Sequence, residues 1–329
     1  MTCRTAWFGL TALLIAFGAI SSAAHAQQYP DRPIRIIVPV PPGGSLDGVP
    51  RAVSQYINAQ PGWTTVIDNR PGAGTGTGTI AGKQAAPDGY TLTAINGNSH
   101  GSLLSMKRDV GFDPINDFEP IILVADAPMV LLVRADLPVR TVPEFIELLR
   151  KRPGELNFGS AGIGSQHHLA TAMFLDRAGL PPTIATHVPA RGLALAITDL
   201  LSGSVQFMIS SVGPAWQHVD AGKLRALATT GPKRLARMPD IPTMVELGFR
   251  DFEMLAWSGL AAPKGTPDAV LARWNELTNK SLTDPEVLKQ IANFDFEPRG
   301  GTRAEFADFI KREYTRYRNL GESAGLMTQ

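Results

Sequence analysis

The feature that most constrains the fold is a repeated alternation of strand and helix patterns. Residues 34–40 (IRIIVPV) form a Val- and Ile-rich run, which predicts a buried strand because β-branched side chains favour extended backbone. Residues 47–59 follow with apolar positions four apart, the spacing of an amphipathic helix. Further strands are expected at residues 64–69 and 90–96. This order requires parallel pairing with right-handed crossovers, so we predict an α/β protein.

A second unit of the same kind begins near residue 140. Thr141 and Glu144 match a capping box, which predicts the start of a helix. The expected strands are 156–161, 183–188, 205–212, 224–230 and 253–262, and the expected helices are 165–178, 190–202, 267–281, 285–293 and 302–324. Between the units, residues 119–136 predict two strands joined at residues 126–128, a crossing between lobes. Two units with two crossings predict a hinged, two-lobed molecule with a cleft.

Ligands of open α/β sheets bind at the carboxyl ends of strands, where two loops of this chain share one pattern. In residues 41–47 (PPGGSLD), glycines precede a helix, and the N–H groups of such a helix start favour a carboxylate or phosphate. Asp47, as an N-cap, would compete for the same donors. Residues 160–166 (SAGIGSQ) repeat the pattern in the second unit. The two loops indicate an acid ligand, and two ordinary strand-to-helix turns are the alternative.

Other motifs support different chemistry. Residues 97–101 (GNSHG) match G-x-S-x-G, so an exported serine hydrolase using Ser99 is an alternative function. His167 and His168 are adjacent, and on a helix they point in different directions, so no metal site is predicted. Arg191 is a candidate partner for an acid ligand, or simply a surface arginine. The glycine-rich residues 70–78 fit neither G-x-G-x-x-G nor a P-loop, which excludes nucleotide binding.

The N-terminus predicts a cleaved signal peptide over residues 1–26. A charged start precedes the uncharged, apolar residues 6–20, and Ala24 and Ala26 supply the small residues that signal peptidase reads. The apolar run is too short for a stable membrane span, which needs about 20 residues. Cleavage also removes Cys3, the only cysteine, so we expect neither a disulfide nor a thiolate nucleophile.

Length and charge exclude further classes of function. Removal of 26 of the 329 residues leaves 303, enough for one large domain or two of ordinary size. The whole chain has 31 Lys and Arg against 30 Asp and Glu, without a basic block. Nucleic acid and anionic membranes are therefore not expected as partners.

A series of motifs then occurs in one order along the predicted mature chain. They are YPDRPIRIIVP at 29–39, NRPGAG at 69–74, APDGYTL at 86–92, NFGSAGIGS at 157–165, HVP at 187–189, AGKLRALA at 221–228, PDIPT at 239–243, APKGTP at 262–267 and PRGGT at 298–302. This series resembles the Bug-type solute receptors of tripartite tricarboxylate transporters. The resemblance covers essentially the whole predicted mature chain.

The resemblance implies a Venus-flytrap periplasmic binding protein fold, in which each lobe is a mixed sheet flanked by helices. Lobe 1 would be residues 27–126 plus 228–329, and lobe 2 residues 127–227. It implies a monomeric periplasmic receptor without catalysis or cofactor, which delivers a small carboxylate to membrane permease subunits. A sensor receptor that presents its ligand to a signalling partner is an alternative. The implied contact residues are Pro42, Gly43, Gly44, Ser45, Asp47, Ser99, His100, Ala161, Gly162, Gly164, Ser165, Ala190, Arg191 and Ser210.

Departures from the family pattern bear on the ligand. Ala190 stands where many members have tyrosine, which enlarges the cleft if that side chain faces inward. Ser210 and Ser211 replace a frequent Asp-Asn pair, and Ala172 replaces a frequent glutamate. Fewer acidic groups leave fewer partners for a ligand amine. We therefore predict an organic acid without an amino group, aromatic or bulky.

Overall fold

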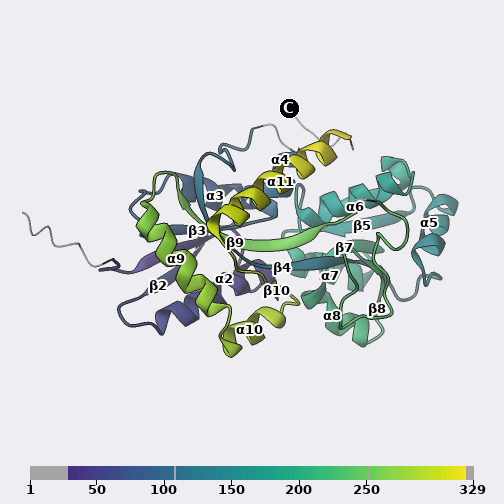
Figure 1. Ribbon diagram of the computed structural model, residues 1–329. Helices are drawn as coiled ribbons and strands as arrows, with labels where there is room; N and C mark the ends of the chain where they lie inside the picture. Colours follow the sequence, from purple (N-terminus) through teal and green to yellow (C-terminus); the bar gives the residue numbers. More distant parts are fainter. Residues whose placement is uncertain (1–28, 107–108, 251, 324–329) are drawn as a thin grey trace, which may run out of the picture.

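The structure, a computed structural model, describes residues 29–106, 109–250 and 252–323. The predicted signal peptide lies outside these residues. The strands form one sheet in the order β2-β1-β3-β9-β4-β7-β5-β6, and β8 and β10 (Glu297–Pro298) each pair with β4. The molecule is elongated, with β2 and β3 toward one end and β5 and β7 toward the other (Figure 1). No helix within the described ranges is long and apolar enough to cross a membrane.

Lobe 1 contains the first α/β unit and the C-terminal helices. Its strands are β1 (Ile34–Val38), β2 (Thr65–Asn69), β3 (Thr91–Asn96) and β9 (Leu255–Pro263). Its helices are α2 (Ser45–Asn58), α3 (Gly76–Lys83), α4 (Leu103–Met106), α9 (Asp268–Ser281), α10 (Pro285–Ala292) and α11 (Arg303–Ser323), with the short turns η1 (Ala73–Thr75) and η2 (Asn98–Ser102). β1 pairs in parallel with β2 and β3, which confirms the predicted parallel pairing. The Val- and Ile-rich strands bury their side chains against α2, α9 and α10.

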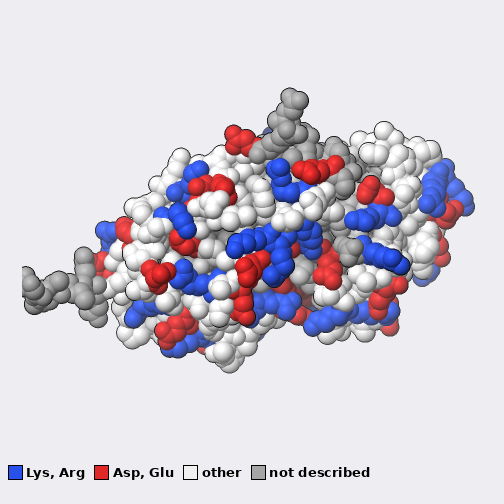
Figure 2. All heavy atoms as spheres, turned by 45° about the horizontal axis from the view of Figure 1, so that its top comes forward, with Lys and Arg blue, Asp and Glu red and all other residues white. Residues whose placement is uncertain are grey.

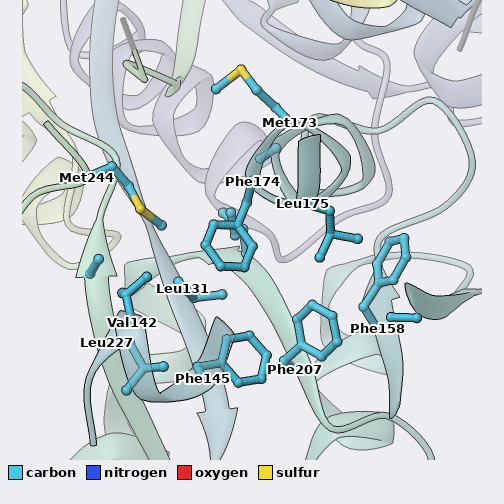
Figure 3. Packing of buried hydrophobic residues seen from close by; sticks show 14 of the residues in the cluster. Leu131, Val142, Phe145, Phe158, Met173, Phe174, Leu175, Phe207, Leu227 and Met244 are labelled. Carbon is cyan, nitrogen blue, oxygen red and sulfur yellow. The ribbon is translucent and has the colours of Figure 1, made fainter. Parts of the chain in front are cut away.

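Lobe 2 repeats the arrangement. Its strands are β5 (Leu156–Ser160), β6 (Ala185–Pro189), β7 (Phe207–Ser211) and β8 (Leu224–Thr229), and its helices are α5 (Val142–Lys151), α6 (Gln166–Arg177), α7 (Leu193–Ser202) and α8 (Val212–Asp220), with the turn η3 (Pro182–Ile184). The predicted capping box of Thr141 and Glu144 is present at the start of α5. Phenylalanine rings meet in the core (Figure 3): Phe145 stacks on Phe174 at 6.1 Å and meets Phe207 edge-on at 4.9 Å. Such aromatic burial stabilises the lobe without a disulfide.

The crossing between the lobes differs from the prediction. Residues 119–136 do not form two strands joined at 126–128, because β4 (Phe118–Arg134) is one strand of 17 residues. Its first part pairs with β9, and its last part pairs with β7 and β8. Pro128 has no N–H to donate within a sheet. It lies at the position where β4 stops pairing with β9 and begins to pair with β7 and β8, so the strand continues through it. Asp126 is held by an ion pair with Arg299 at 2.8 Å, so neither residue ends the strand.

β4 also fixes the direction of the other strands. It runs from lobe 1 into lobe 2, and β3 runs the same way because both are antiparallel to β9. β7 is antiparallel to β4, and β5 and β6 are parallel to β7. The carboxyl ends of β1, β2 and β3 therefore face those of β5, β6 and β7 across the boundary between the lobes. The ligand loops of an α/β sheet lie at these ends.

Candidate functional site

The first predicted loop provides unfilled backbone donors at the start of α2. Gly44 is the N-cap of α2, and no side chain caps this helix. Within the described residues, the N–H groups of Gly44, Ser45 and Leu46 have no hydrogen-bond partner. Pro42, Gly43 and Gly44 are exposed to solvent. Three unfilled donors at a helix N-terminus can bind an anionic oxygen.

Asp47 lies inside the first turn of α2 and is not the N-cap that the sequence predicted. Its carboxylate accepts hydrogen bonds from Gly43 N (2.9 Å), Arg51 Nε (2.8 Å) and Asn69 Nδ2 (2.8 Å). Burial raises the pKa of this carboxyl, but these hydrogen bonds outweigh burial and bring the pKa below its usual value. Asp47 therefore occupies one loop donor and ties the loop to β2, while the other donors stay free.

The second predicted loop, residues 161–165, ends at the N-cap of α6. Ser165 caps α6 by accepting from His168 N (3.3 Å), and its hydroxyl donates to Gly162 O (2.7 Å). Gly162 and Gly164 have φ of 127° and 79°, which other residues adopt only with strain. The N–H groups of residues 163 and 167 lack a partner within the described part of the chain. This loop therefore also offers free donors at a helix start.

A stack of aromatic rings supports the second loop. The rings of His168 and His187 are parallel, with centroids 3.8 Å apart, and Phe158 stacks on His187 at 4.8 Å. Ser160 Oγ lies 2.7 Å from His187 Nε2. Burial lowers the pKa of His168 to about 4, and burial together with repulsion from a charge on His168 lowers the pKa of His187 to about 4. Both rings are therefore neutral at pH 7, and they add no positive charge to the site.

Ser99 and His100 lie in η2, directly after β3, and both are fully buried. Ser99 Oγ donates to Asn96 O (3.1 Å) and accepts from Asn96 N (3.1 Å), which closes the turn. The His100 ring packs against Phe118, and burial lowers its pKa to about 3. His100 Nε2 has no partner within the described ranges, so no carboxylate orients this ring as in a catalytic triad. Contact of either residue with a ligand stays a prediction.

The remaining predicted residues are divided. Ala190 lies beside the second loop: its N–H donates to Ser160 O (3.0 Å), and a Cβ on Gly162 would lie 3.4 Å from its carbonyl oxygen. Arg191 is exposed, and within the described ranges it makes no ion pair. Ser210 is fully buried, with its hydroxyl bonded to Ser211 O (3.0 Å). The structure therefore joins Ala190 to the loop of Gly162 and Ser165, and it places Ser210 within the sheet.

Direct contacts join the loops of the two lobes. Gln166 N donates to Asn98 Oδ1 (2.9 Å), and Ser102 Oγ donates to Gly164 O (2.9 Å). On another part of the boundary, Phe294 lies against the starts of α2 and α8, within 3 Å of where a Cβ on Gly48 or Gly213 would be. Sequence reasoning missed Asn98, Gln166 and Phe294. A glycine in the first turn of α2 and of α8 was the available signal for a close neighbour.

Neither a patch of one charge on the face in Figure 2 nor a metal site within the described residues competes with these loops as a binding site. Acidic and basic side chains are interspersed over the face in Figure 2. Within the described residues, no group of three or more His, Cys, Asp or Glu side chains could hold a metal ion. Two surface hollows of about 420 and 400 Å³ are lined by other residues, the first including Arg134 and Lys223 and the second Tyr29 and Arg273. The facing loops are therefore the best-supported site for a small anion.

Comparisons with known sequences relate this chain to a family of receptors. The profile described as "Tripartite tricarboxylate transporter family receptor" (TctC) matches residues 49–326. A "UPF0065 protein in tcbD-tcbE intergenic region" of Pseudomonas sp. strain P51 is 36% identical over 312 residues, which are 93% of this chain and 91% of that protein. Protein BugT of Bordetella pertussis is 33% identical over 314 residues, which are 95% of each chain.

Solved structures agree with the sequence comparison. An R. palustris protein with adipate is 30% identical, with a TM-score of 0.83 over 90% of this chain and 98% of that one. Periplasmic binding protein BugD is 31% identical, with a TM-score of 0.82 over 91% and 100%. MatC of Rhodopseudomonas palustris with bound malate is 27% identical, with a TM-score of 0.81 over 89% and 100%. The chain therefore has the two-lobed fold predicted for it and belongs to the tripartite tricarboxylate transporter receptor (TctC, Bug-type) family, whose members are solute receptors of the periplasm and not enzymes.

Proposed function

We propose that this protein is a periplasmic receptor that binds a small organic acid between its lobes and delivers it to the membrane permease of a tripartite tricarboxylate transporter. The observation that carries the proposal is the set of unfilled N–H groups at the starts of α2 and α6. They belong to loops at the facing carboxyl ends of β1 and β5. A carboxylate on the solute would accept hydrogen bonds from both lobes.

The proposed solute lacks an amino group. In residues 40–47, 97–102, 161–166 and 190–192 the only carboxylate is Asp47, which Gly43, Arg51 and Asn69 already occupy. A ligand ammonium would lose its hydration without gaining a charged partner in these loops. Similar proteins carry adipate and malate, acids without nitrogen. Ala190, beside the loop of Gly162, is smaller than the tyrosine that many family members carry there, so we propose a larger acid, aromatic or bulky.

Export, lobe boundaries and partners belong to the same proposal. We assign residues 1–26 to a cleaved signal peptide, residues 27–126 plus 228–329 to lobe 1 and residues 127–227 to lobe 2, so that the second boundary falls within β8, before its last two residues. We propose that the receptor is a monomer, so that a single loaded chain would dock with the permease. The permease would recognise the form in which the lobes have closed on the acid, because binding shifts the population toward that form.

A thermal-shift screen followed by calorimetry tests the solute class. The mature protein would be measured with adipate, malate, benzoate and glutamate. A ligand at 100 times its Kd adds about 2.7 kcal/mol to the free energy of unfolding. We expect stabilisation by one or more of the acids that lack an amino group. Tight binding of glutamate with none of the simple acids bound would refute the proposed solute class.

A pair of variants at Ser45 tests the role of the backbone donors. Ser45 is the first residue of α2, and Gly44 before it is extended (φ −87°, ψ 171°), so Ser45→Pro removes one free N–H without strain on the helix. A hydrogen bond to a charged group contributes about 1.5–3 kcal/mol, so affinity should fall about tenfold or more. Ser45→Ala keeps the N–H and serves as the control. Equal affinities of the two variants would contradict the assignment of these donors.

A further inference from the structure

The two glycines of the G-x-S-x-G segment at residues 97–101 are not accounted for by ligand binding, and the structure gives them another role. Gln166, the first residue of α6, extends its side chain out of lobe 2 and into lobe 1. Its Nε2 donates to Leu255 O (2.8 Å) in β9 and to Tyr317 OH (2.5 Å) in α11. Because Leu255 O can only accept, the amide must present its nitrogen there. Gln166 is 2% exposed, so these bonds are shielded from water.

The glycines of this segment make the space for both partners. A Cβ at Gly97 would overlap the side-chain amide of Gln166, and a Cβ at Gly101 would lie 2.7 Å from the Tyr317 ring. Asn98, between them, accepts the backbone N–H of Gln166 at 2.9 Å. The segment is therefore a socket in lobe 1 that receives the N-terminus of α6 from lobe 2.

The socket lies at the crossing between the lobes. Leu255 begins β9 and pairs with Pro128, where β4 changes its partners from β9 to β7 and β8. α11 lies over β9 and extends toward α6 (Figure 1), which brings Tyr317 to the same place. Groups near a crossing move least when two lobes rotate about it, so a contact there can persist while the cleft opens and closes.

We propose that Gln166 is a positioning residue: it fixes the start of α6 to lobe 1 at the crossing, and so orients the free N–H groups of residues 163 and 167 toward the solute. The inference rests on the proposed function for its binding readout. Gln166 itself does not touch the solute, because its side chain is buried against Leu255 and Tyr317. It acts on affinity through the orientation of the loop.

Variants on both sides of the socket test this role, with adipate as the probe in calorimetry. Gln166→Ala removes two hydrogen bonds, and affinity should fall about tenfold. Gly97 has helical φ and ψ (−62°, −17°), so Gly97→Ala acts only by displacing the Gln166 side chain and should cause a similar loss. The double variant should bind no more weakly than Gln166→Ala, because an alanine at position 166 leaves room for the new methyl group. If the losses of affinity in the two single variants added up in the double variant, the proposed socket would be wrong.

Gln206→Ala is the matched control. The Gln206 side chain also makes two hydrogen bonds: it accepts from Asn157 N (2.8 Å) and donates to Gly203 O (2.7 Å), and both partners lie within lobe 2. This variant should lose stability and keep its affinity. If it lost affinity as Gln166→Ala does, general loosening would explain both and the positioning role would be wrong.

Gln166→Glu supplies a pH readout that a purely structural role would not give. At pH 8 its carboxylate would face the Leu255 carbonyl oxygen, whereas a protonated carboxyl at pH 5 can donate to it. Burial raises the pKa of a carboxyl into this range. The ratio of its Kd to that of wild type should therefore fall between pH 8 and pH 5. A constant ratio would count against the donor role.

Hydrogen exchange without any solute separates this inference from the proposed function. Gln166→Ala should speed amide exchange at residues 166–170, while Gln206→Ala should not. If wild type binds no acid but this local effect is present, the proposed function fails and the anchoring of α6 stands. Unchanged exchange in Gln166→Ala would overturn the anchoring, whatever the protein binds.

Discussion

Low pH should destabilise this protein, because the native state buries several histidines in their neutral form. His167 is the clearest case. The residue is 7% exposed, and neither ring nitrogen has a partner within the described residues. Burial lowers its pKa from 6.5 to about 4. The unfolded chain therefore binds a proton at a higher pH than the native state does. Stability from this group is present above pH 6.5 and is lost as the pH falls toward 4.

The size of this effect follows from the two pKa values. Near pH 5 the unfolded histidine is almost fully protonated and the native one is mostly neutral, so unfolding takes up about 0.9 proton. The free energy of unfolding should then fall by about 1.2 kcal/mol per pH unit near pH 5, and by about 3 kcal/mol in total between pH 7 and pH 4. His100 adds a loss of the same sign. Asp126 and Glu313, which are buried, and the partly buried Asp295 oppose it, because burial raises the pKa of each.

Comparing variants isolates His167 from these other groups. His167→Leu should be at least as stable as wild type at pH 7, because it removes two unsatisfied polar atoms, and its urea midpoint should change less with pH. Leu169→Ala, at a fully buried position of the same helix, is the control: it should lower stability by a similar amount at every pH. If His167→Leu kept the wild-type pH slope, the ring would not be neutral and buried in the native state.

Three further changes follow from single contacts. Asp47→Ala removes the acceptor for Gly43, Arg51 and Asn69 and should lower the free energy of unfolding in urea by about 3 kcal/mol. Asp47→Asn keeps one acceptor oxygen and should lower it less. Equal losses of stability in the two variants would contradict a role for the acceptor. Arg299→Ala leaves the carboxylate of Asp126, which is 4% exposed, without its ion pair. The free energy of unfolding should fall by about 3 kcal/mol at pH 7 and by less at pH 4. A loss of stability that did not depend on pH would contradict this explanation. Thr141→Ala removes the cap of α5 and should cost about 1 kcal/mol, while Thr141→Ser should restore most of it.

The sequence predicted those parts of the fold that depend on local pattern. The strands at Ile34–Val38 and Leu156–Ser160 were expected because β-branched or apolar runs precede glycine-rich turns. The helix Val212–Asp220 was missed because Gly213 and Pro214 resemble a loop. In the first turn of a helix, however, the missing N–H of proline costs nothing. The turn expected at residues 126–128 failed for a tertiary reason, since the partners of β4 change there.

The candidate site divides in the same way. Both loops with free donors were predicted, since glycines before a helix start are a local signal. The bond from Gln166 N to Asn98 Oδ1 joins residues 68 apart in sequence, and it depends on how one lobe lies against the other. No pattern within either segment contains that information. The G-x-S-x-G match was a real signal that something packs closely there, but only the structure shows that its partners are Gln166 and Tyr317.

The two loops therefore look alike in sequence but are held in different ways. The loop before α2 is organised within lobe 1, because Asp47 binds Gly43 in the loop and Asn69 in the neighbouring strand. The loop before α6 is held within lobe 2 by Ser165 and is also held from the other lobe, through Asn98 and Ser102. The first set of bonds is independent of the other lobe, whereas the second set needs the two lobes to stay in contact at the crossing. The donors at the start of α6 are thus the ones whose orientation depends on a contact between the lobes, and that contact lies near the axis about which the lobes would rotate.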